Sequence, residues 1–276
     1  MVETRVPAVL TIAGSDSGGG AGIQADLKAF ARCGVHGTSA ITALTAQNTT
    51  GVDAIVPTPP EMIVSQVRAV VSDIGVDAVK IGMLGDEATI GAVLDALDVI
   101  AGHRRGVPVV VDPVMVSESG ATLLDPNAKA ALIERILPRA AVVTPNLPEA
   151  RALAGAGPDA SPEELGRAIL ALGPRAVIVT GGHAADGADV LVDDDGAVRI
   201  EGPRYPSDAA HGSGCTHSSA LAALLARGME LPEAARWARE IAAEAVHRGL
   251  TGIGAGPGPV DVLGLSGRQV EPPGPD

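Results

Sequence analysis

Short apolar runs alternate with helix-like segments along most of this chain. The runs have the length of buried strands and lie at residues 8–13, 37–44, 78–81, 107–111, 141–144 and 176–180. The segments between most of them carry apolar residues three and four positions apart and lie at residues 61–71, 87–100, 127–137, 148–153 and 162–172. Each helix of such a series returns the chain to the edge of the sheet where the next strand begins, so the strands run parallel. The alternation therefore predicts a three-layer α/β fold, with a mostly parallel central sheet and helices on both faces.

The pattern changes after residue 180. Residues 187–192 and 197–201 flank Asp193-Asp194-Asp195-Gly196, and an Asp-Gly pair between two strand-like runs is typical of a hairpin. Two helical segments follow, at residues 214–226 and 232–248. We expect an antiparallel pair to complete the sheet, a single domain over residues 1–265, and a flexible Gly/Pro-rich tail over residues 266–276.

Composition and charge limit the partners of this chain. Its aromatic residues are Phe30, Tyr205 and Trp237, so the core must be built from Ala, Val, Leu and Ile, and a stacking platform for single-stranded nucleic acid is not expected. The net charge of −13 repels polyanions, so neither nucleic acid nor an anionic membrane is an expected partner. A small phosphate compound stays compatible with this charge, because backbone N–H groups can bind it locally.

Cysteine usage and the N-terminal segment indicate a compartment. The two cysteines, Cys33 and Cys215, are too few for a disulfide framework and suit a reducing cytosol. The apolar run at residues 6–13 is too short for a signal peptide or a membrane span. We expect a soluble cytoplasmic protein.

A glycine-rich turn follows the first strand-like run. Residues 13–26 read Ala-Gly-Ser-Asp-Ser-Gly-Gly-Gly-Ala-Gly-Ile-Gln-Ala-Asp, and glycines at such a turn let the backbone approach a ligand closely. Residues 20–25 also fit the G-x-G-x-x-A pattern of dinucleotide-binding folds, although no acidic residue follows the second strand-like run to bind a ribose. From the residues alone, a ligand-binding turn and a tight turn without a ligand both remain open.

Small residues also precede the helical segment at 214–226. The sequence there is His211-Gly212-Ser213-Gly214-Cys215, and the first N–H groups of a helix, together with its dipole, favour a bound anion. Cys215 at this position is expected to have a lowered pKa and to be able to act as a base or nucleophile. The alternative is a small buried residue behind an ordinary helix start, which is also the interpretation for Cys33.

Polar residues follow three of the later strand-like runs. Asn146 and Glu149 lie three positions apart at a helix start, which fits either a capping box or a pair of ligands for hydrated Mg²⁺. Asp112 follows one apolar run, and Thr180 with Gly182 follows another, where open α/β sheets place their ligands.

Several common catalytic motifs are missing from the sequence. None of Lys28, Lys80 and Lys129 follows a glycine, which excludes a Walker-type phosphate loop. The sequence has neither a G-x-S-x-G elbow nor an H-E-x-x-H zinc motif. A thiol nucleophile formed by Cys215 with His211 or His217 has no support in spacing or flanking residues.

Taken together, these segments resemble the hydroxymethylpyrimidine/phosphomethylpyrimidine kinases of thiamin biosynthesis, which belong to the ribokinase-like kinases. The resemblance begins with the run at residues 12–28 and continues, in the family's order, through residues 39–49, 80–84, 112–116, 144–150 and 212–216. It covers nearly the whole chain. One such motif would be weak evidence, but six in order are highly specific. The resemblance implies a ribokinase-like fold.

The resemblance implies a phosphoryl transfer from MgATP to 4-amino-5-hydroxymethyl-2-methylpyrimidine, and then a second transfer to its monophosphate. It implies that Gln47 hydrogen-bonds the aminopyrimidine, because an amide offers both a donor and an acceptor. The residues implied to complete that pocket are Asp26, Gly14, Met83 and Thr45. Cys215 resembles the family's base, and the N–H groups of Gly212, Ser213, Gly214 and Cys215 resemble its site for the transferred phosphoryl.

The remaining implied roles concern ATP and its metal. Asn146 and Glu149 are implied to orient Mg²⁺ and its waters, and the ATP site is implied to include Asp112, Asn146, Thr180 and Gly182. Thr180 departs from the family pattern, because many relatives carry a lysine there, and no nearby arginine is an evident substitute in the sequence. The resemblance suggests a homodimer without identifying an interface. Two other functions stay open: a pyridoxal or pyridoxine kinase of the same fold, and a catalytically weak pyrimidine-binding protein.

Overall fold

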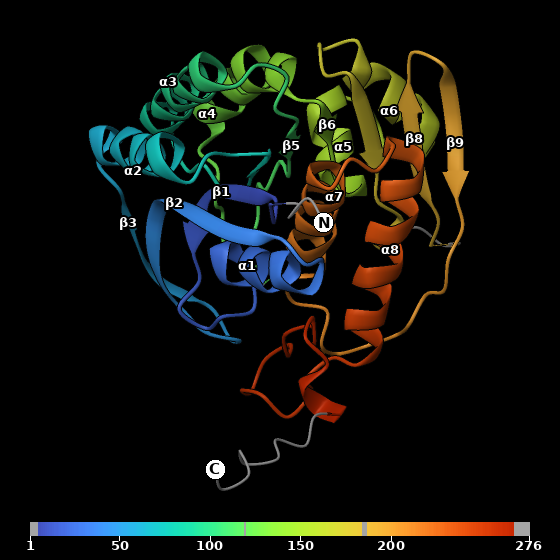
Figure 1. The fold of residues 1–276 in the computed structure, drawn as a ribbon. Helices are drawn as coiled ribbons and strands as arrows, with labels where there is room; N and C mark the ends of the chain where they lie inside the picture. The colour runs from blue at the N-terminus through green and yellow to red at the C-terminus, as the bar shows by residue number, and fades with distance from the viewer. Residues whose placement is uncertain (1–4, 119, 184–186, 268–276) are drawn as a thin grey trace, which may run out of the picture.

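The described strands form one twisted sheet that divides the molecule into layers (Figure 1). The computed structural model describes residues 5–118, 120–183 and 187–267. The strands are β1 (Ala8–Ser15), β2 (His36–Gln47), β3 (Val52–Pro57), β4 (Ala78–Ile81), β5 (Val109–Val111), β6 (Val142–Val143), β7 (Ala176–Val179), β8 (Asp189–Asp193) and β9 (Gly196–Ile200), in the order β3-β2-β1-β4-β5-β6-β7-β8-β9. β2, β1, β4, β5, β6 and β7 run parallel, which confirms the predicted sheet.

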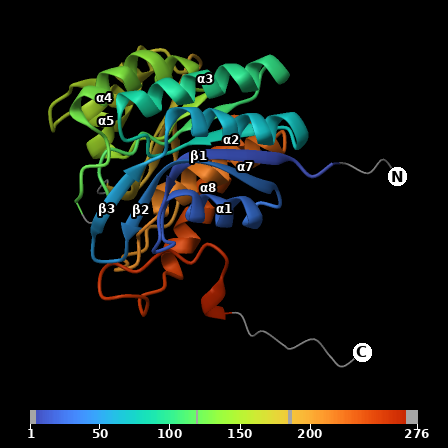
Figure 2. The same cartoon turned by 90° about the vertical axis from the view of Figure 1, so that its left-hand side faces the viewer.

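Helices cover both faces of this sheet. They are α1 (Gly22–Arg32), α2 (Pro60–Asp73), α3 (Glu87–His103), α4 (Pro126–Ala131), α5 (Leu147–Ala154), α6 (Pro162–Leu170), α7 (Ser213–Ala226) and α8 (Leu231–His247). α2 to α6 share one apolar core with the sheet, and α1, α7 and α8 share another on the opposite face. Figure 2 shows α2 and α3 above the sheet and α1 below it. Both cores consist mainly of Ala, Val, Leu and Ile, as composition predicted, and Phe30 of α1 is fully buried.

The predicted hairpin is present, and one further strand was missed. β8 and β9 pair antiparallel around the Asp-Gly turn at one end of the sheet. β3 pairs antiparallel with β2 at the other end, and none of its residues is buried. The sequence analysis did not predict β3, because an exposed edge strand lacks the buried positions that reveal a strand by periodicity.

The predicted helix at residues 127–137 is wrong in its second half. α4 ends at Ala131, a π-helical turn covers Leu132–Ile136, and a 3₁₀ turn covers Leu137–Arg139. Pro138 explains the change, because it has no N–H to donate and its ring clashes with the carbonyl four residues earlier in a regular α-helix.

The predicted tail divides in two. Leu265–Gly267 form a 3₁₀ turn, and the backbone N–H groups of Leu265 and Ser266 donate to the carboxylate of Asp261 at 2.7 and 2.9 Å. Residues 268–276 lie outside the described part of the chain. Within the described ranges, no helix is both long enough and apolar enough to cross a membrane.

The strand order places a switch point between β1 and β4. From β1 the chain moves outward to β2 and β3, then returns to place β4 on the other side of β1. In open α/β sheets the loops diverge at such a point and leave a crevice beyond the carboxyl ends of the strands. Gly14 near the end of β1, and Met83 just after β4, lie at this crevice.

Candidate active site

A cavity of about 500 Å³ opens at the carboxyl ends of the parallel strands. Most residues predicted for the site line it: Gly14, Thr45, Gln47, Met83, Asp112, Asn146, Thr180, Gly182, Gly212, Ser213, Gly214 and Cys215. Asp26 and Glu149 are not among the lining residues. Segments far apart in sequence therefore meet at one site whose size suits a small molecule.

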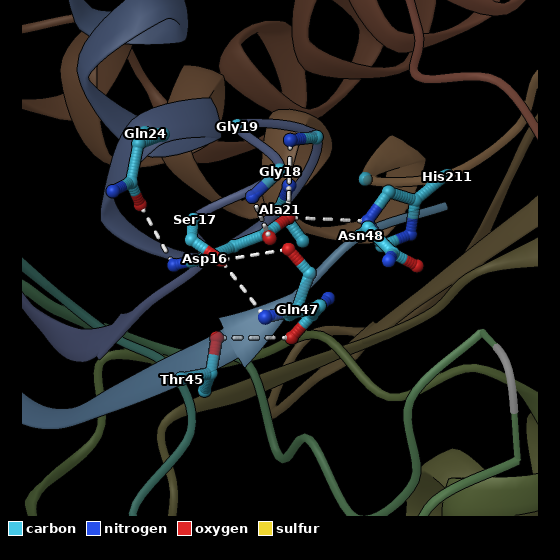
Figure 3. A network of polar contacts seen from close by, with 12 residues as sticks. Asp16, Ser17, Gly18, Gly19, Ala21, Gln24, Thr45, Gln47, Asn48 and His211 are labelled. Atoms are coloured by element: carbon cyan, nitrogen blue, oxygen red, sulfur yellow. Dashed lines mark hydrogen bonds and ion pairs between the residues drawn. The ribbon is translucent and has the colours of Figure 1, made fainter. Parts of the chain in front are cut away.

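Asp16 organises the glycine-rich turn between β1 and α1 (Figure 3). Its carboxylate accepts hydrogen bonds from the backbone N–H groups of Gly18, Gly20 and Ala21, at 2.8, 3.0 and 2.8 Å. The Nε2 atom of His211 lies 3.2 Å from the same carboxylate. Burial opposes the charge, but these partners outweigh it and hold the pKa of Asp16 below its usual value. Because the chain's own carboxylate takes these N–H groups, they are not available to a pyrophosphate, which argues against the dinucleotide alternative.

Gln47 is fixed at the end of β2 by this turn (Figure 3). The hydroxyl of Ser17 donates to the carbonyl of Gln47 and accepts from its N–H, at 2.7 and 2.8 Å. The hydroxyl of Thr45 donates to the carbonyl of Ser15 at 2.9 Å and reaches the side-chain oxygen of Gln47 at 3.4 Å. The amide of Gln47 is thus positioned at the cavity wall, and its NH₂ group has no hydrogen-bond partner among the described residues.

Two glycine-rich segments meet beside the cavity. Gly212 has a φ of +85°, and a Cβ atom there would lie 1.8 Å from the carbonyl oxygen of Gly20. Gly22 has a φ of +56°, and a Cβ atom there would lie 2.4 Å from the carbonyl oxygen of Gly14. These close approaches, and not flexibility, require glycine at both positions. They bring the start of α7 against the turn that follows β1.

The first turn of α7 presents its N–H groups at the cavity. Gly212 is the N-cap residue, and no side chain caps the helix start. The N-terminal N–H groups and the helix dipole favour an anion at this point. The structure therefore supports the expected anion-binding character of Gly212, Ser213, Gly214 and Cys215 in geometry.

Cys215 does not have the lowered pKa that its position predicted. Burial raises the pKa of its thiol to about 12, and the carboxylates of Asp112 and Asp26 add to the effect. The ammonium of Lys80 and the N–H of Gly22 act in the opposite direction but do not outweigh burial. The prediction rested on the helix start alone. It could not include the carboxylates of Asp112 and Asp26, because they come from other elements of the fold. The two histidines near Cys215 in sequence pair with other groups: His211 with Asp16 and His217 with Asp189.

A buried ionic cluster reaches the cavity wall through Lys80 and Asp112 and was not predicted. The Nζ atom of Lys80 in β4 lies 2.9 Å from Asp26 and 3.8 Å from Asp112, and its side chain is completely buried. The hydroxyls of Thr11 and Ser219 donate to Asp26 at 2.6 and 2.7 Å. Burial opposes the charge on Lys80, but the neighbouring anions outweigh it and raise the pKa of its ammonium.

The cluster changes the role expected of Asp26. This residue is fully buried and has its carboxylate occupied by Lys80, Thr11 and Ser219, so it lies below the pocket wall. Asp26 is therefore not among the residues that line the cavity, and its expected part in the pyrimidine pocket stays a prediction. Lys80 stands in an apolar strand, where a lysine is costly unless it is paired, and this was the signal that could have revealed the cluster.

Asn146 and Glu149 form the capping box that the sequence allowed. The side chain of Asn146 accepts from the N–H of Glu149 at 2.9 Å, and the side chain of Glu149 accepts from the N–H of Asn146 at 3.0 Å. Burial and the nearby carboxylate of Asp112 raise the pKa of Glu149 to about 8. Burial also raises the pKa of Asp112, although Lys80 opposes the shift.

This acidic pair fits a divalent cation. Two carboxyl groups that destabilise each other's negative charge become favourable when a cation lies near both. Within the described residues, no group of three or more His, Cys, Asp or Glu side chains could hold a metal by itself. Mg²⁺ suits such a sparse set, because it keeps several waters and takes further oxygens from substrate phosphates.

Two arginines line the same cavity as Thr180, which the sequence did not reveal. Thr180 follows β7, where its N–H donates to the carbonyl of Pro145 at 2.9 Å. Arg204 and Arg239 line the same cavity, with Asp189 and His217. The sequence showed no evident substitute for a lysine at position 180, but the fold brings two arginines that are distant in sequence to the same cavity.

Comparisons with known proteins agree with this geometry. Residues 16–261 match the protein family described as phosphomethylpyrimidine kinase. A hydroxymethylpyrimidine/phosphomethylpyrimidine kinase of Rhizobium meliloti is 49% identical over 257 residues, which cover 91% of this chain and 95% of that protein. The chain belongs to the phosphomethylpyrimidine kinase family.

Solved structures of relatives support the same assignment. A phosphomethylpyrimidine kinase of Clostridium difficile superposes with a TM-score of 0.76 at 41% identity, covering 87% of this chain and 99% of that one. A pyridoxal kinase of Staphylococcus aureus, solved with AMP-PCP and pyridoxal, superposes with a TM-score of 0.83 at 35% identity, covering 96% of each chain. The ribokinase-like fold and the kinase class predicted from the sequence are confirmed. Membership in this kinase family implies ATP as co-substrate.

Proposed function

We propose that this phosphomethylpyrimidine kinase family member transfers the γ-phosphoryl of ATP to the hydroxymethyl group of 4-amino-5-hydroxymethyl-2-methylpyrimidine, and then a second phosphoryl to the monophosphate. The observation that carries the proposal is the convergence of two features on one cavity. The amide of Gln47 lines one wall, and the start of α7 lines another. A pyrimidine edge and a transferring phosphoryl group would be bound side by side.

Gln47 is the proposed reader of the pyrimidine. Its oxygen accepts from a ring amino group while its NH₂ donates to a ring nitrogen, a combination that a carboxylate does not offer. Thr45 and Ser17 hold the residue in place, and Gly14 and Met83 form an apolar surface beside it. Asp26 acts indirectly in this proposal, by holding Lys80 in place at the cavity wall.

Phosphoryl transfer is proposed to occur at the start of α7. The hydroxymethyl oxygen attacks the γ-phosphorus, the bond to the β-phosphate oxygen of ATP breaks, and ADP leaves. The thiolate form of Cys215 takes the hydroxyl proton and becomes the thiol, while the N–H groups of Gly212 to Cys215 stabilise the charge on the phosphoryl oxygens. A loose transition state asks more of positioning and charge stabilisation than of a base. A thiol with a pKa of about 12 is compatible with that order of importance.

Mg²⁺ is the proposed metal, held near Asn146 and Glu149 with Asp112 close by. When bound, it would neutralise phosphate charge. Asp112, Asn146, Thr180 and Gly182 are the proposed neighbours of the ATP phosphates. Replacing Glu149 with Gln preserves the capping hydrogen bond, because glutamine also serves at that position. The substitution should raise the Mg²⁺ concentration needed for half-maximal rate without changing the KM for the pyrimidine.

The test is mass detection of products after incubation of the purified protein with MgATP and the pyrimidine. A diphosphate supports both steps, and the monophosphate alone supports the first and removes the second. The absence of a phosphorylated product from both the pyrimidine and its monophosphate would overturn the proposed function. The Cys215→Ala variant serves as the matched control for a contaminating kinase.

Pyridoxal is the competing acceptor, because the pyridoxal kinase of Staphylococcus aureus has a closely similar fold. Rates with the two acceptors at equal concentration separate the possibilities. A preference for pyridoxal would contradict the role given to Gln47. Thermal stabilisation by the pyrimidine with no ATP turnover would instead indicate a pyrimidine-binding protein without catalysis.

We also propose that residues 1–265 act as one kinase domain in the cytoplasm, and that two copies form a homodimer through the β2–β3 edge. Leu44 and Val56 are direct cross-strand neighbours there and are 54% and 62% exposed. This exposed apolar pair lies at an open sheet edge, where unpaired backbone groups favour pairing with another strand. Light scattering of the wild type and of a Val56→Lys variant tests this pairing, since a dimer should become a monomer in the variant.

A further inference from the structure

Nearly all the positive charge at the cavity is committed to the chain's own carboxylates. The basic residues along the cavity wall are Lys80, Arg204, His211, His217 and Arg239. The carboxylates that face them are Asp26 for Lys80, Asp16 for His211, and Asp189 for both His217 and Arg239. Arg204 is the exception. It has no hydrogen-bond or ion-pair partner among the residues that the structure describes.

The side chain of Arg204 rests on a glycine at the cavity wall. A Cβ atom built on Gly187 would lie 3.2 Å from Cδ and 3.3 Å from Cβ of Arg204, so the arginine stem lies along the Gly187 backbone. Gly187 has a φ of +71°, a conformation that also favours glycine. Gly187 itself lines the cavity. The absence of a side chain at this position therefore lets Arg204 lie directly at the cavity wall.

Arg239 holds both segments on which this placement depends. One of its guanidinium nitrogens donates to the carbonyls of Gly187 and Gly202, and another donates to Asp189 at 2.8 Å. Asp189 in turn accepts from the N–H of Gly181 at 2.7 Å. Gly202 is two residues before Arg204, so the buried Arg239 ties the loop that carries Arg204 to the segment beneath it. Both terminal nitrogens of Arg239 are engaged in these contacts, whereas Arg204 is left available.

We propose that Arg204 binds the phosphate chain of the nucleotide and supplies the cation that Thr180 does not. The inference rests on the proposed transfer from ATP, whose polyphosphate must enter a chain with a net charge of −13. Thr180, at the end of β7 on the same cavity, carries no charge. Arginine suits the task because its planar fork of donors matches phosphate oxygens.

The experiment compares the Arg204→Gln variant with Arg105→Gln. Arg105 is exposed and precedes β5, at the amino ends of the strands and away from the cavity. Its replacement therefore makes the same change in net charge without removing a side chain from the cavity wall. Calorimetry with a non-hydrolysable ATP analogue and with AMP gives affinities that do not depend on turnover. Steady-state kinetics then give the KM for ATP and for the acceptor, and Arg204→Lys tests how much a positive charge alone restores.

Loss of an exposed charge-assisted hydrogen bond predicts roughly a tenfold weaker affinity for the ATP analogue in Arg204→Gln. AMP binding should fall less, the KM for ATP should rise by a similar factor, and the KM for the acceptor should not change. Equal losses for the analogue and AMP, an equal loss in Arg105→Gln, or unchanged affinity would each overturn the proposal. Failure of the proposed function is separate, because it would appear as absence of product in the wild type while nucleotide binding still tests Arg204.

Discussion

Replacing Lys80 with methionine should destabilise the protein more than any other single change in the cavity floor. The ammonium lies 2.9 Å from Asp26 and 3.8 Å from Asp112, and neither Lys80 nor Asp26 is exposed. Removing one partner of a buried ion pair typically costs about 3–5 kcal/mol, because the remaining charge is left without compensation. Uptake of a proton by an ordinary aspartate at pH 7 costs about 4 kcal/mol, which sets a ceiling on the loss. We therefore expect a decrease of about 3–4 kcal/mol in the free energy of unfolding.

Urea unfolding of four proteins measures this effect. The Lys80→Met/Asp26→Asn double variant removes both charges and keeps an oxygen that can accept from Thr11 and Ser219, so it should be at least about 2 kcal/mol more stable than Lys80→Met. Lys129→Met, at a lysine for which the described structure shows no ion pair, is the matched control and should lie within about 0.5 kcal/mol of the wild type. At pH 5 the ceiling falls to about 1.5 kcal/mol, so the penalty for Lys80→Met should shrink.

Two outcomes would refute this reasoning. One is a free energy of unfolding for Lys80→Met within about 1 kcal/mol of the wild-type value at pH 7, well short of the roughly 3–5 kcal/mol expected when a buried ion pair loses one partner. The other is a double variant no more stable than the single one, which would mean that Asp26 and Lys80 do not stabilise each other. Either result would also remove the indirect role proposed for Asp26.

The remaining predictions concern the start of α7, the thiols and the turn after β1. Cys215→Ala should lower kcat by roughly 10²-fold or more with little change in pyrimidine affinity, and near-normal turnover would contradict its role as base. Gly212→Ala should cost at least about 2 kcal/mol of stability, because its Cβ would lie 1.8 Å from the carbonyl oxygen of Gly20. Gly214→Ala should be tolerated, because a Cβ there would have nothing within 4 Å, and thermal unfolding of the two variants tests the difference. Burial raises the pKa of Cys33 to about 11 and of Cys215 to about 12, so both should react slowly with a disulfide reagent at pH 7.5 and quickly after denaturation. The lowered pKa of Asp16 contributes stability that is present above its ordinary value of 3.8 and is lost as pH falls through the folded value, so Asp16→Asn should be less stable at pH 7 but should show a flatter acid-denaturation profile.

Local patterns were sufficient for much of the fold. The strand at 78–81 and the helix starts at Glu87 and Pro162 lie where the apolar periodicity and capping residues placed them. Such features depend on neighbours within one or two turns, so the sequence contains the needed information. The prediction did not foresee that the helix at 127–137 changes its hydrogen bonding after Ala131, and it missed β3, none of whose residues is buried.

The sequence predicted which residues meet at the site better than it predicted their burial and their pKa values. Motif order brought Gly14, Gln47, Met83 and Cys215 into the site, and the structure places each of them on one cavity. The complete burial of Asp26 and its pairing with Lys80 were not predicted, because burial is a property of packing. The pKa of Cys215 was assigned the wrong direction for a related reason: a helix dipole is local, whereas the buried carboxylates of Asp26 and Asp112 come from α1 and from the loop after β5.

By itself, then, the sequence determined the alternation of strands and helices, the glycines that close contacts require, and the family to which the chain belongs. Only the tertiary structure decided which charges face one another: Lys80 with Asp26, Arg239 with Asp189, and Arg204 with no carboxylate of the described residues. The physical reason is range. Backbone periodicity acts over a few residues, while an ion pair depends on distance in space, and these partners are separated by 54 and 50 residues along the chain.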